Sequence, residues 1–183
     1  MYSAARANEY LESPGWFEII DAMDIHGGAR DKFVRLTSSA ITDAGIPVQS
    51  VQLLPYIPTI ITKMGANGTL LTQLLRPEDP RLKDPNEAEY ILTRSRSDHP
   101  HVGGVYMRMF PAVERVDTKD VVSVNGVGDT FLGALVAGLA MGGRVENLVD
   151  VAQRAAVLTL KSRESVALEV EGLRGALREA VGR

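Results

Sequence analysis

The stretch that decides the fold is Val121-Val-Ser-Val-Asn-Gly126-Val-Gly128-Asp129-Thr-Phe-Leu-Gly-Ala134. An apolar, β-branched run leads into a turn with two glycines, and the turn opens onto an apolar helix with a carboxylate in its first residues. Glycines lack the Cβ atoms that would keep an anion away, and the free N–H groups at a helix start add the positive end of the helix dipole. The pattern predicts a phosphate cradle at the turn that contains Gly126 and Gly128.

Asp129, at the start of that helix, allows two interpretations. A carboxylate repels phosphate, so its place beside the cradle suits a general base that accepts the proton of an attacking hydroxyl. Alternatively, the two glycines form an ordinary strand-to-helix turn and Asp129 is the N-cap residue, which is a common arrangement. The residue pattern alone leaves both interpretations open.

Length and composition bound the class of protein. The chain has 183 residues, a net charge of −3 and 45% hydrophobic residues, which fits one globular domain rather than two. The sequence contains no uncharged run of about 18 apolar residues that could span a membrane. The N-terminal segment also has neither the basic start nor the apolar core of a signal peptide. We therefore expect a cytoplasmic protein with no membrane partner.

The same composition excludes several kinds of site. Cysteine is absent and there are three scattered histidines, so we expect no protein-held metal centre. The net charge is slightly negative and the sequence has no block of Lys or Arg, which argues against nucleic acid as a partner. A small-molecule function is favoured.

Helix and strand patterns alternate along the chain and predict an α/β layered domain. The run 58–64 is short, apolar and β-branched, as expected for a buried strand of a parallel sheet. Four prolines and many charges predict a loop or insertion over 76–104, with a short helix near 86–92. The remaining expected strands are 69–73, 105–110 and 120–124, and the expected helices are 1–11, 14–23, 29–44, 129–141 (buried on nearly all faces), 148–159 and 166–181.

The segment Asn125–Gly138 resembles the C-terminal signature of PfkB-type carbohydrate kinases of the ribokinase-like superfamily, D-T-x-G-A-G-D followed by a helix of small residues. Ile60–Leu71 is similar to the strand, G-x-x-G turn and strand at the family's nucleotide site, and Ala152–Thr159 resembles its late helix beside the base. The insertion after Arg76 looks most like the kinase domain of eukaryotic pseudouridine-metabolising proteins. This resemblance implies a ribokinase-like three-layer α/β/α (Rossmann-like) fold.

The resemblance also implies an activity. The chain would transfer phosphate from ATP, with Mg²⁺, to an alcohol group of a sugar or nucleoside such as pseudouridine. Asp129 would be the catalytic base, and Gly126, Val127 and Gly128 the anion hole. A pseudouridine-5′-phosphate glycosidase domain, fused or associated, is the implied protein partner. The implied nucleotide-binding residues are Lys63, Gly65, Ala66, Asn67, Gly68 and Gln153.

Several positions depart from the family pattern. Ser123 and Val124 replace the leading Asp and Thr of the signature, which removes a carboxylate that helps relatives build a monovalent-cation site, so we expect little potassium dependence. Lys63 stands where many relatives have Thr. The alternative to a role in nucleotide binding is that Lys63 is a solvent-directed residue at the end of a strand. Gln153 stands where the family commonly has Asn. The alternative to contact with the nucleotide base is that Gln153 is an ordinary solvated helix residue.

Length is the largest departure, since a family member has on the order of 300 residues. We expect residues 1–183 to be the C-terminal portion of the kinase domain, as in a truncated gene model or a fragment. The sugar-binding half and the N-x-x-E magnesium motif would precede residue 1. Asn8 and Glu9 are too close together in the sequence to be that motif, and we expect them on a surface helix. A non-catalytic nucleotide-binding remnant and a plain protein-interaction domain are the alternatives to a kinase.

Overall fold

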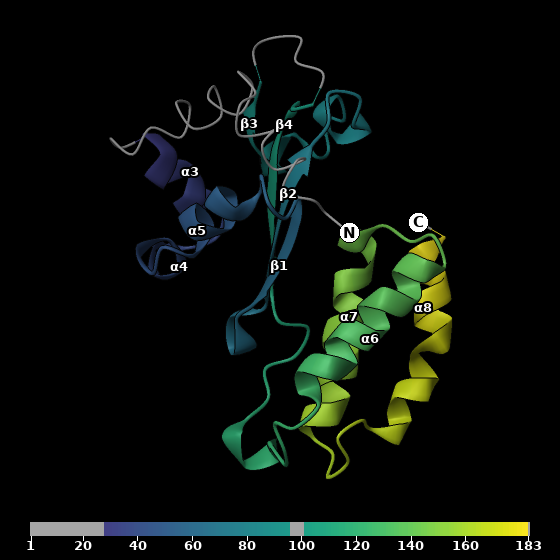
Figure 1. The fold of residues 1–183 in the computed structure, drawn as a ribbon. Helices are drawn as coiled ribbons and strands as arrows, with labels where there is room; N and C mark the ends of the chain where they lie inside the picture. The colour runs from purple at the N-terminus through teal and green to yellow at the C-terminus, as the bar shows by residue number, and fades with distance from the viewer. Residues whose placement is uncertain (1–27, 96–100, 183) are drawn as a thin grey trace. The chain divides into compact units, whose positions relative to one another are not determined.

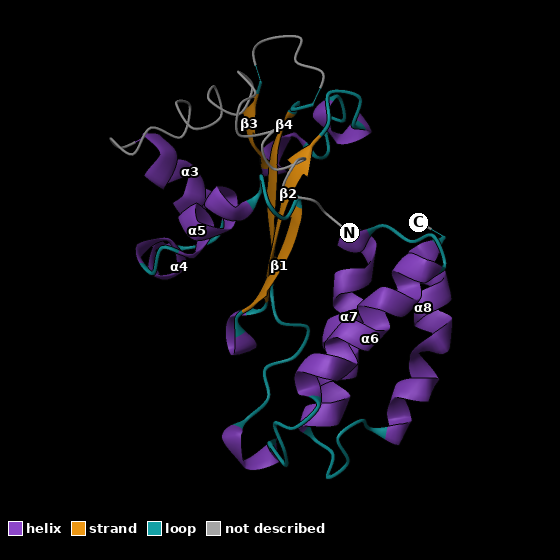
Figure 2. Cartoon of the chain, viewed as in Figure 1, coloured by secondary structure: helices purple, strands orange, loops and turns teal. Residues whose placement is uncertain are grey.

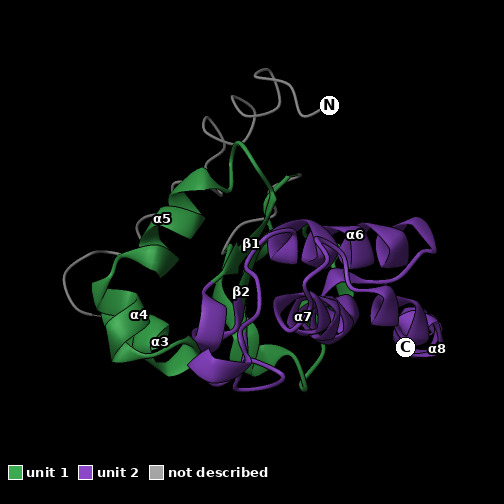
Figure 3. Cartoon of the chain, turned by 90° about the horizontal axis from the view of Figure 1, so that it is seen from below, with its two compact units in different colours: residues 1–63, 70–109 green, residues 64–69, 110–183 purple. Residues whose placement is uncertain are grey.

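The computed structural model describes residues 28–95 and 101–182, and the helices expected over 1–11 and 14–23 lie outside them. The chain divides into two compact units (Figure 3). One unit comprises Met1–Lys63 with Leu70–Met109, and the other comprises Met64–Thr69 with Phe110–Arg183. Among the described residues, no helix is both long enough and apolar enough to cross a membrane.

The described part of the first unit begins with three short helices, α3 (Gly28–Leu36), α4 (Ser39–Asp43) and α5 (Ile46–Leu53) (Figure 1). The single helix expected over 29–44 is wrong, because the chain is interrupted at Ser38, whose extended backbone lets its side chain accept a hydrogen bond from the Ile41 N–H at 3.2 Å. Serine competes with helical hydrogen bonding in this way and caps the next helix instead.

A four-stranded sheet follows, in the order β1-β2-β4-β3 (Figure 2). The strands are β1 (Thr59–Lys63), β2 (Thr69–Leu75), β3 (Ile91–Arg94) and β4 (Gly104–Phe110). The tight connection from β1 to β2 forms an antiparallel hairpin, in which the Met64 N–H bonds the Gly68 carbonyl at 2.8 Å. β3 and β4 are antiparallel too. The mixed α/β class is confirmed, whereas the expectation of a buried parallel strand over 58–64 is wrong, since β1 is an edge strand.

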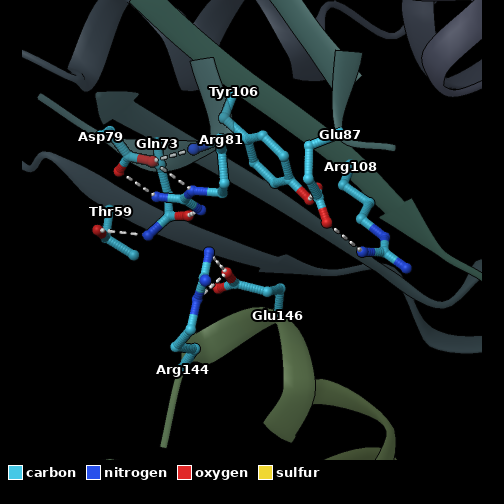
Figure 4. Close-up of polar contacts among 9 residues, drawn as sticks. All are labelled: Thr59, Gln73, Asp79, Arg81, Glu87, Tyr106, Arg108, Arg144 and Glu146. Carbon is cyan, nitrogen blue, oxygen red and sulfur yellow. Dashed lines mark hydrogen bonds and ion pairs between the residues drawn. The ribbon is translucent and has the colours of Figure 1, made fainter. Parts of the chain in front are cut away.

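The segment 76–104, described at 76–95 and 101–104, has more regular structure than the expected loop, and the short helix expected near 86–92 is confirmed by a 3-10 helix. It contains β3 and the short 3-10 helices Pro80–Leu82 and Ala88–Tyr90. Arg81 is only 8% exposed and fixes this segment by pairing with Asp79 at 2.8 Å and donating to the Gln73 side chain at 2.7 Å (Figure 4). The guanidinium also lies 4.8 Å from the centroid of the Tyr106 ring. A buried charge with these partners holds the segment against the strands.

Tyr106 is fully buried in β4 and donates to a Glu87 carboxylate oxygen at 2.9 Å (Figure 4). Burial is the main cause that raises the pKa of Tyr106 well above its usual value, and the bond to Glu87 adds to it. The neutral phenol therefore stabilises the fold fully below pH about 10, and this contribution is lost as the pH rises further, because the unfolded chain ionises first.

We predict that Tyr106→Phe lowers the free energy of unfolding by about 1–2 kcal/mol at pH 7, since Glu87 loses its donor. Between about pH 10 and 11 the wild-type protein should lose stability more steeply than the variant. Urea unfolding at pH 7, 9 and 10.5 measures both effects. Parallel pH profiles would show that Tyr106 does not titrate as the structure indicates.

The described residues of the second unit form three α-helices, α6 (Val127–Ala140), α7 (Val145–Leu160) and α8 (Arg174–Val181) (Figure 1). α6 approaches α7 closely at Gly138, where a Cβ atom would lie 2.4 Å from the Leu148 side chain. The opposite face of α6 is open, since Leu132 is 56% and Val136 is 52% exposed. The expectation that this helix is buried on nearly all faces is therefore wrong.

Two other expectations in this unit fail. The strand expected over 120–124 does not form, because the Val122 N–H bonds the Leu160 carbonyl at the end of α7, at 2.9 Å, rather than a neighbouring strand. The helix expected over 166–181 is divided into the 3-10 helix Leu168–Leu173 and α8, with Val166 exposed before it. The helical spacing of apolar residues over 166–181 was therefore not enough to produce one continuous helix.

Candidate active site

The glycine turn leads directly into α6, as the sequence predicted, although the strand expected before the turn does not form. Gly126 occupies the N-cap position with a φ of +72°, a left-handed conformation that glycine adopts without a Cβ penalty. No side chain caps this helix, and the Thr130 N–H makes the first helical bond to the Gly126 carbonyl at 2.8 Å. The N–H groups of Val127, Gly128 and Asp129 have no acceptor inside the helix, so they are available to an anion.

Asp129 lies in the first turn of α6 and is exposed. The alternative interpretation, that Asp129 is the N-cap residue, is wrong, because that position belongs to Gly126. Within the described part of the chain, no hydrogen bond or ion pair engages its carboxylate. Asp129 therefore stands beside the free amides with its proton-accepting oxygens open to solvent.

Gly126 is also fixed by the rest of the second unit. A Cβ atom at this position would lie 1.6 Å from the carbonyl oxygen of Ser165. The absence of a side chain is thus required by the protein's own backbone. This close approach holds the turn before α6 against the segment that follows α7.

The hairpin turn Gly65–Gly68 contains two glycines with positive φ, and they serve different purposes. At Gly68 a Cβ atom would lie 2.1 Å from the Phe110 carbonyl oxygen, so the chain itself requires glycine. At Gly65 an added Cβ would meet nothing within 4 Å, which leaves space for a ligand. Ala66 and Asn67 between them are exposed, and so is Lys63 at the end of β1.

Gln153, in α7, is only 8% exposed, and its side-chain amide donates to the Pro111 carbonyl at 3.1 Å. The alternative of an ordinary solvated helix residue is therefore wrong. Pro111 also lies against Gly68, where a Cβ atom would approach its carbonyl carbon to 2.8 Å. The structure thus joins the Gly65–Gly68 turn to α7 through Pro111, and contact between Gln153 and a nucleotide base stays a prediction.

Ser123 stands where the family signature has Asp, and its hydroxyl accepts the Asn125 N–H at 3.1 Å. The side chain therefore shapes the turn before Gly126. In the parts of the chain that the structure describes, no group of three or more His, Cys, Asp or Glu residues could hold a metal ion. These residues alone do not form a magnesium site, and no chemical step is assigned to one.

The string Asn86-Glu87-Ala88-Glu89 matches N-x-x-E, a pattern expected only before residue 1. It follows the Gly65–Gly68 turn along the chain, and its Glu87 accepts a hydrogen bond from Tyr106 and faces Arg108 at 3.9 Å (Figure 4). Glu87 thus has a structural role in the first unit. A scan for the four-residue pattern would have found this string, but its place in the chain order differs from the expected motif.

Comparison with known proteins bears on the second unit most directly. Residues 109–170 match the model of the pfkB family of carbohydrate kinases. A pseudouridine-metabolizing bifunctional protein of Schizosaccharomyces pombe is 29% identical over 177 residues, which cover 94% of this chain. The chain spans 22% of the length of that relative. These matches confirm the resemblance to PfkB-type kinases that the segment Asn125–Gly138 carries.

Proposed function

We propose that this PfkB-type carbohydrate kinase sequence forms the nucleotide-binding and catalytic part of an ATP-dependent phosphotransferase acting on an alcohol group. One observation carries the proposal: an exposed carboxylate, Asp129, stands beside three free amides at a helix start whose N-cap is Gly126. We propose a sugar or nucleoside as acceptor. Pseudouridine is favoured because the S. pombe relative is a pseudouridine-metabolizing protein.

In this reaction the acceptor oxygen forms a bond to the γ-phosphorus of ATP while the bond from that phosphorus to the bridging oxygen breaks. The Asp129 carboxylate accepts the proton that the acceptor hydroxyl releases. The amides of Val127 and Gly128 donate to the phosphoryl oxygens and stabilise their charge. Magnesium, when bound to the phosphates, would neutralise further charge.

The hairpin turn supplies the rest of the proposed nucleotide site. Lys63 would bring a positive charge towards the phosphates, and the open space at Gly65 would let them approach the backbone. Ala66, Asn67 and Gly68 complete the turn, and Gln153 would lie beside the base.

We also propose a cytoplasmic enzyme that uses a small-molecule substrate and binds neither nucleic acid nor membrane. A pseudouridine-5′-phosphate glycosidase domain, fused or associated, is the proposed protein partner, in keeping with the bifunctional relative. The competing proposal is a non-catalytic nucleotide-binding remnant. It is favoured by the lack of a metal-ligand cluster among the described residues.

ATP binding to the purified 183-residue chain tests the nucleotide site. We expect calorimetry to detect weak binding, with a dissociation constant in the millimolar range or below. Gly65→Ala should weaken it about tenfold or more, because the new Cβ enters the space proposed for the nucleotide.

Gly142→Ala is the matched control, since Gly142 also has a positive φ and open space around it, but lies after α6. Both substitutions should lower the melting temperature similarly, and only Gly65→Ala should affect ATP binding. Absence of ATP binding to folded wild-type protein would contradict both the kinase and the remnant.

A further inference from the structure

A buried chain of hydrogen bonds connects the segment after α7 to the glycine at the start of α6. The Ala167 N–H donates to the Thr159 hydroxyl at 3.1 Å, and that hydroxyl donates to the Thr130 hydroxyl at 3.0 Å. The Thr130 hydroxyl then donates to the Gly126 carbonyl at 2.8 Å. Ala167, Thr159 and Thr130 are all buried.

The direction of this chain is fixed by its two ends. A backbone N–H can only donate and a carbonyl can only accept, so each threonine hydroxyl must accept from one side and donate to the other. If the bond between the two hydroxyls were reversed, the Gly126 carbonyl would keep only the Thr130 N–H as donor, and the buried Thr159 hydroxyl would lose its acceptor, at a cost in free energy. The series of hydrogen bonds therefore has one favoured direction, from the Ala167 N–H to the Gly126 carbonyl.

This arrangement determines how the peptide between Gly126 and Val127 is oriented. The Gly126 carbonyl accepts from both the hydroxyl and the N–H of Thr130, each at 2.8 Å. A peptide unit is planar, so a carbonyl held in place also fixes the direction of the N–H on the next residue. That N–H belongs to Val127 and is the first free donor at the start of α6.

We propose that Thr130 and Thr159 are positioning residues that aim the Val127 N–H at the phosphoryl group during transfer. The proposal rests on the proposed function of the same site. Donors that are oriented before the reaction stabilise developing charge without reorganising. Ser165, whose carbonyl oxygen would be 1.6 Å from a Cβ at Gly126, closes the other side of the turn.

Thr159→Val tests the proposal, because valine keeps the shape and removes the hydroxyl that links Ala167 to Thr130. In the natural full-length protein, we expect kcat to fall about tenfold or more, less than the 10²–10³-fold loss typical when a whole donor is removed. The KM for ATP should change less than kcat. Thr159→Ser retains the hydroxyl and should restore kcat to within about threefold.

Thr72→Val is the matched control. The Thr72 hydroxyl is also buried but has no hydrogen-bond partner among the described residues, so its removal should leave kcat unchanged. If Thr159→Val does not fold, Thr159→Ser decides, since a large loss of kcat in that variant would overturn the proposal.

A readout that needs no activity separates this proposal from the proposed function. In two-dimensional NMR spectra of the 183-residue chain, the Val127 amide resonance should shift in Thr159→Val and stay near its wild-type position in Thr72→Val. An unshifted Val127 amide would overturn the positioning role even if ATP binds. A shifted amide in a protein without ATP binding would instead contradict the proposed function alone.

Discussion

Asp129→Asn in the natural full-length protein should lower kcat by about 10²–10⁴-fold, because asparagine cannot accept the proton of the attacking hydroxyl. The free amides before it should remain, since the N-cap is Gly126 and no side chain contributes to capping. ATP affinity should stay the same or rise, because a negative charge beside the triphosphate is removed.

The effect of this substitution on stability should be small. Asp129 is exposed in the first turn of α6, so asparagine loses only the favourable interaction of a carboxylate with the helix dipole, about 0.3–1 kcal/mol. Asp31→Asn is the matched control, since Asp31 is an exposed acidic residue in the first turn of α3. It should show the same small loss of stability and no loss of activity.

Steady-state kinetics and a thermal melt on both variants separate catalysis from stability. A loss of kcat below about tenfold for Asp129→Asn, with the fold intact, would refute the assignment of the catalytic base. Equal kinetic effects of the two substitutions would point to a general effect of charge. Normal kcat with weakened ATP binding would also contradict a role in proton transfer.

Features set by nearby residues could be predicted from the sequence. The positions of the glycine turn before α6 and of the hairpin turn Gly65–Gly68 could be recognised from a few neighbouring residues. Features that depend on distant partners were predicted wrongly. The run 58–64 is a strand as expected, but it pairs with the next strand along the chain in an antiparallel hairpin and lies at the edge of the described sheet, rather than being a buried parallel strand. The apolar run 120–124 bonds to the end of α7 instead of a sheet.

The candidate site shows the same division. Sequence placed Gly126 and Asp129 at the start of a helix, where the structure has them. It attributed the glycines to ligand approach, whereas Gly68 and Gly126 are required by backbone carbonyls of Phe110 and Ser165. These neighbours lie some 40 residues away along the chain, and no local pattern reveals such contacts.

Gly126→Ala should lower the free energy of unfolding by about 2–5 kcal/mol and abolish detectable ATP binding. A non-glycine residue in the left-handed region costs about 1–2 kcal/mol, and overpacking adds about 1–3 kcal/mol. The clash here is severe, since the new Cβ would be 1.6 Å from the Ser165 carbonyl oxygen. Either Gly126 or the segment around Ser165 must move.

Gly142→Ala distinguishes backbone strain from the clash. Gly142 has a φ of +91° with nothing within 4 Å of an added Cβ, so its substitution should cost only the first of the two contributions, about 1–2 kcal/mol. Urea unfolding gives both free energies, and calorimetry gives ATP binding under conditions where each variant is folded. Because movement of Gly126 would also turn the Val127 amide, ATP binding should be lost even where the variant is fully folded. Equal stability of the two variants, or ATP binding by folded Gly126→Ala, would show that the close approach to Ser165 does not fix this turn.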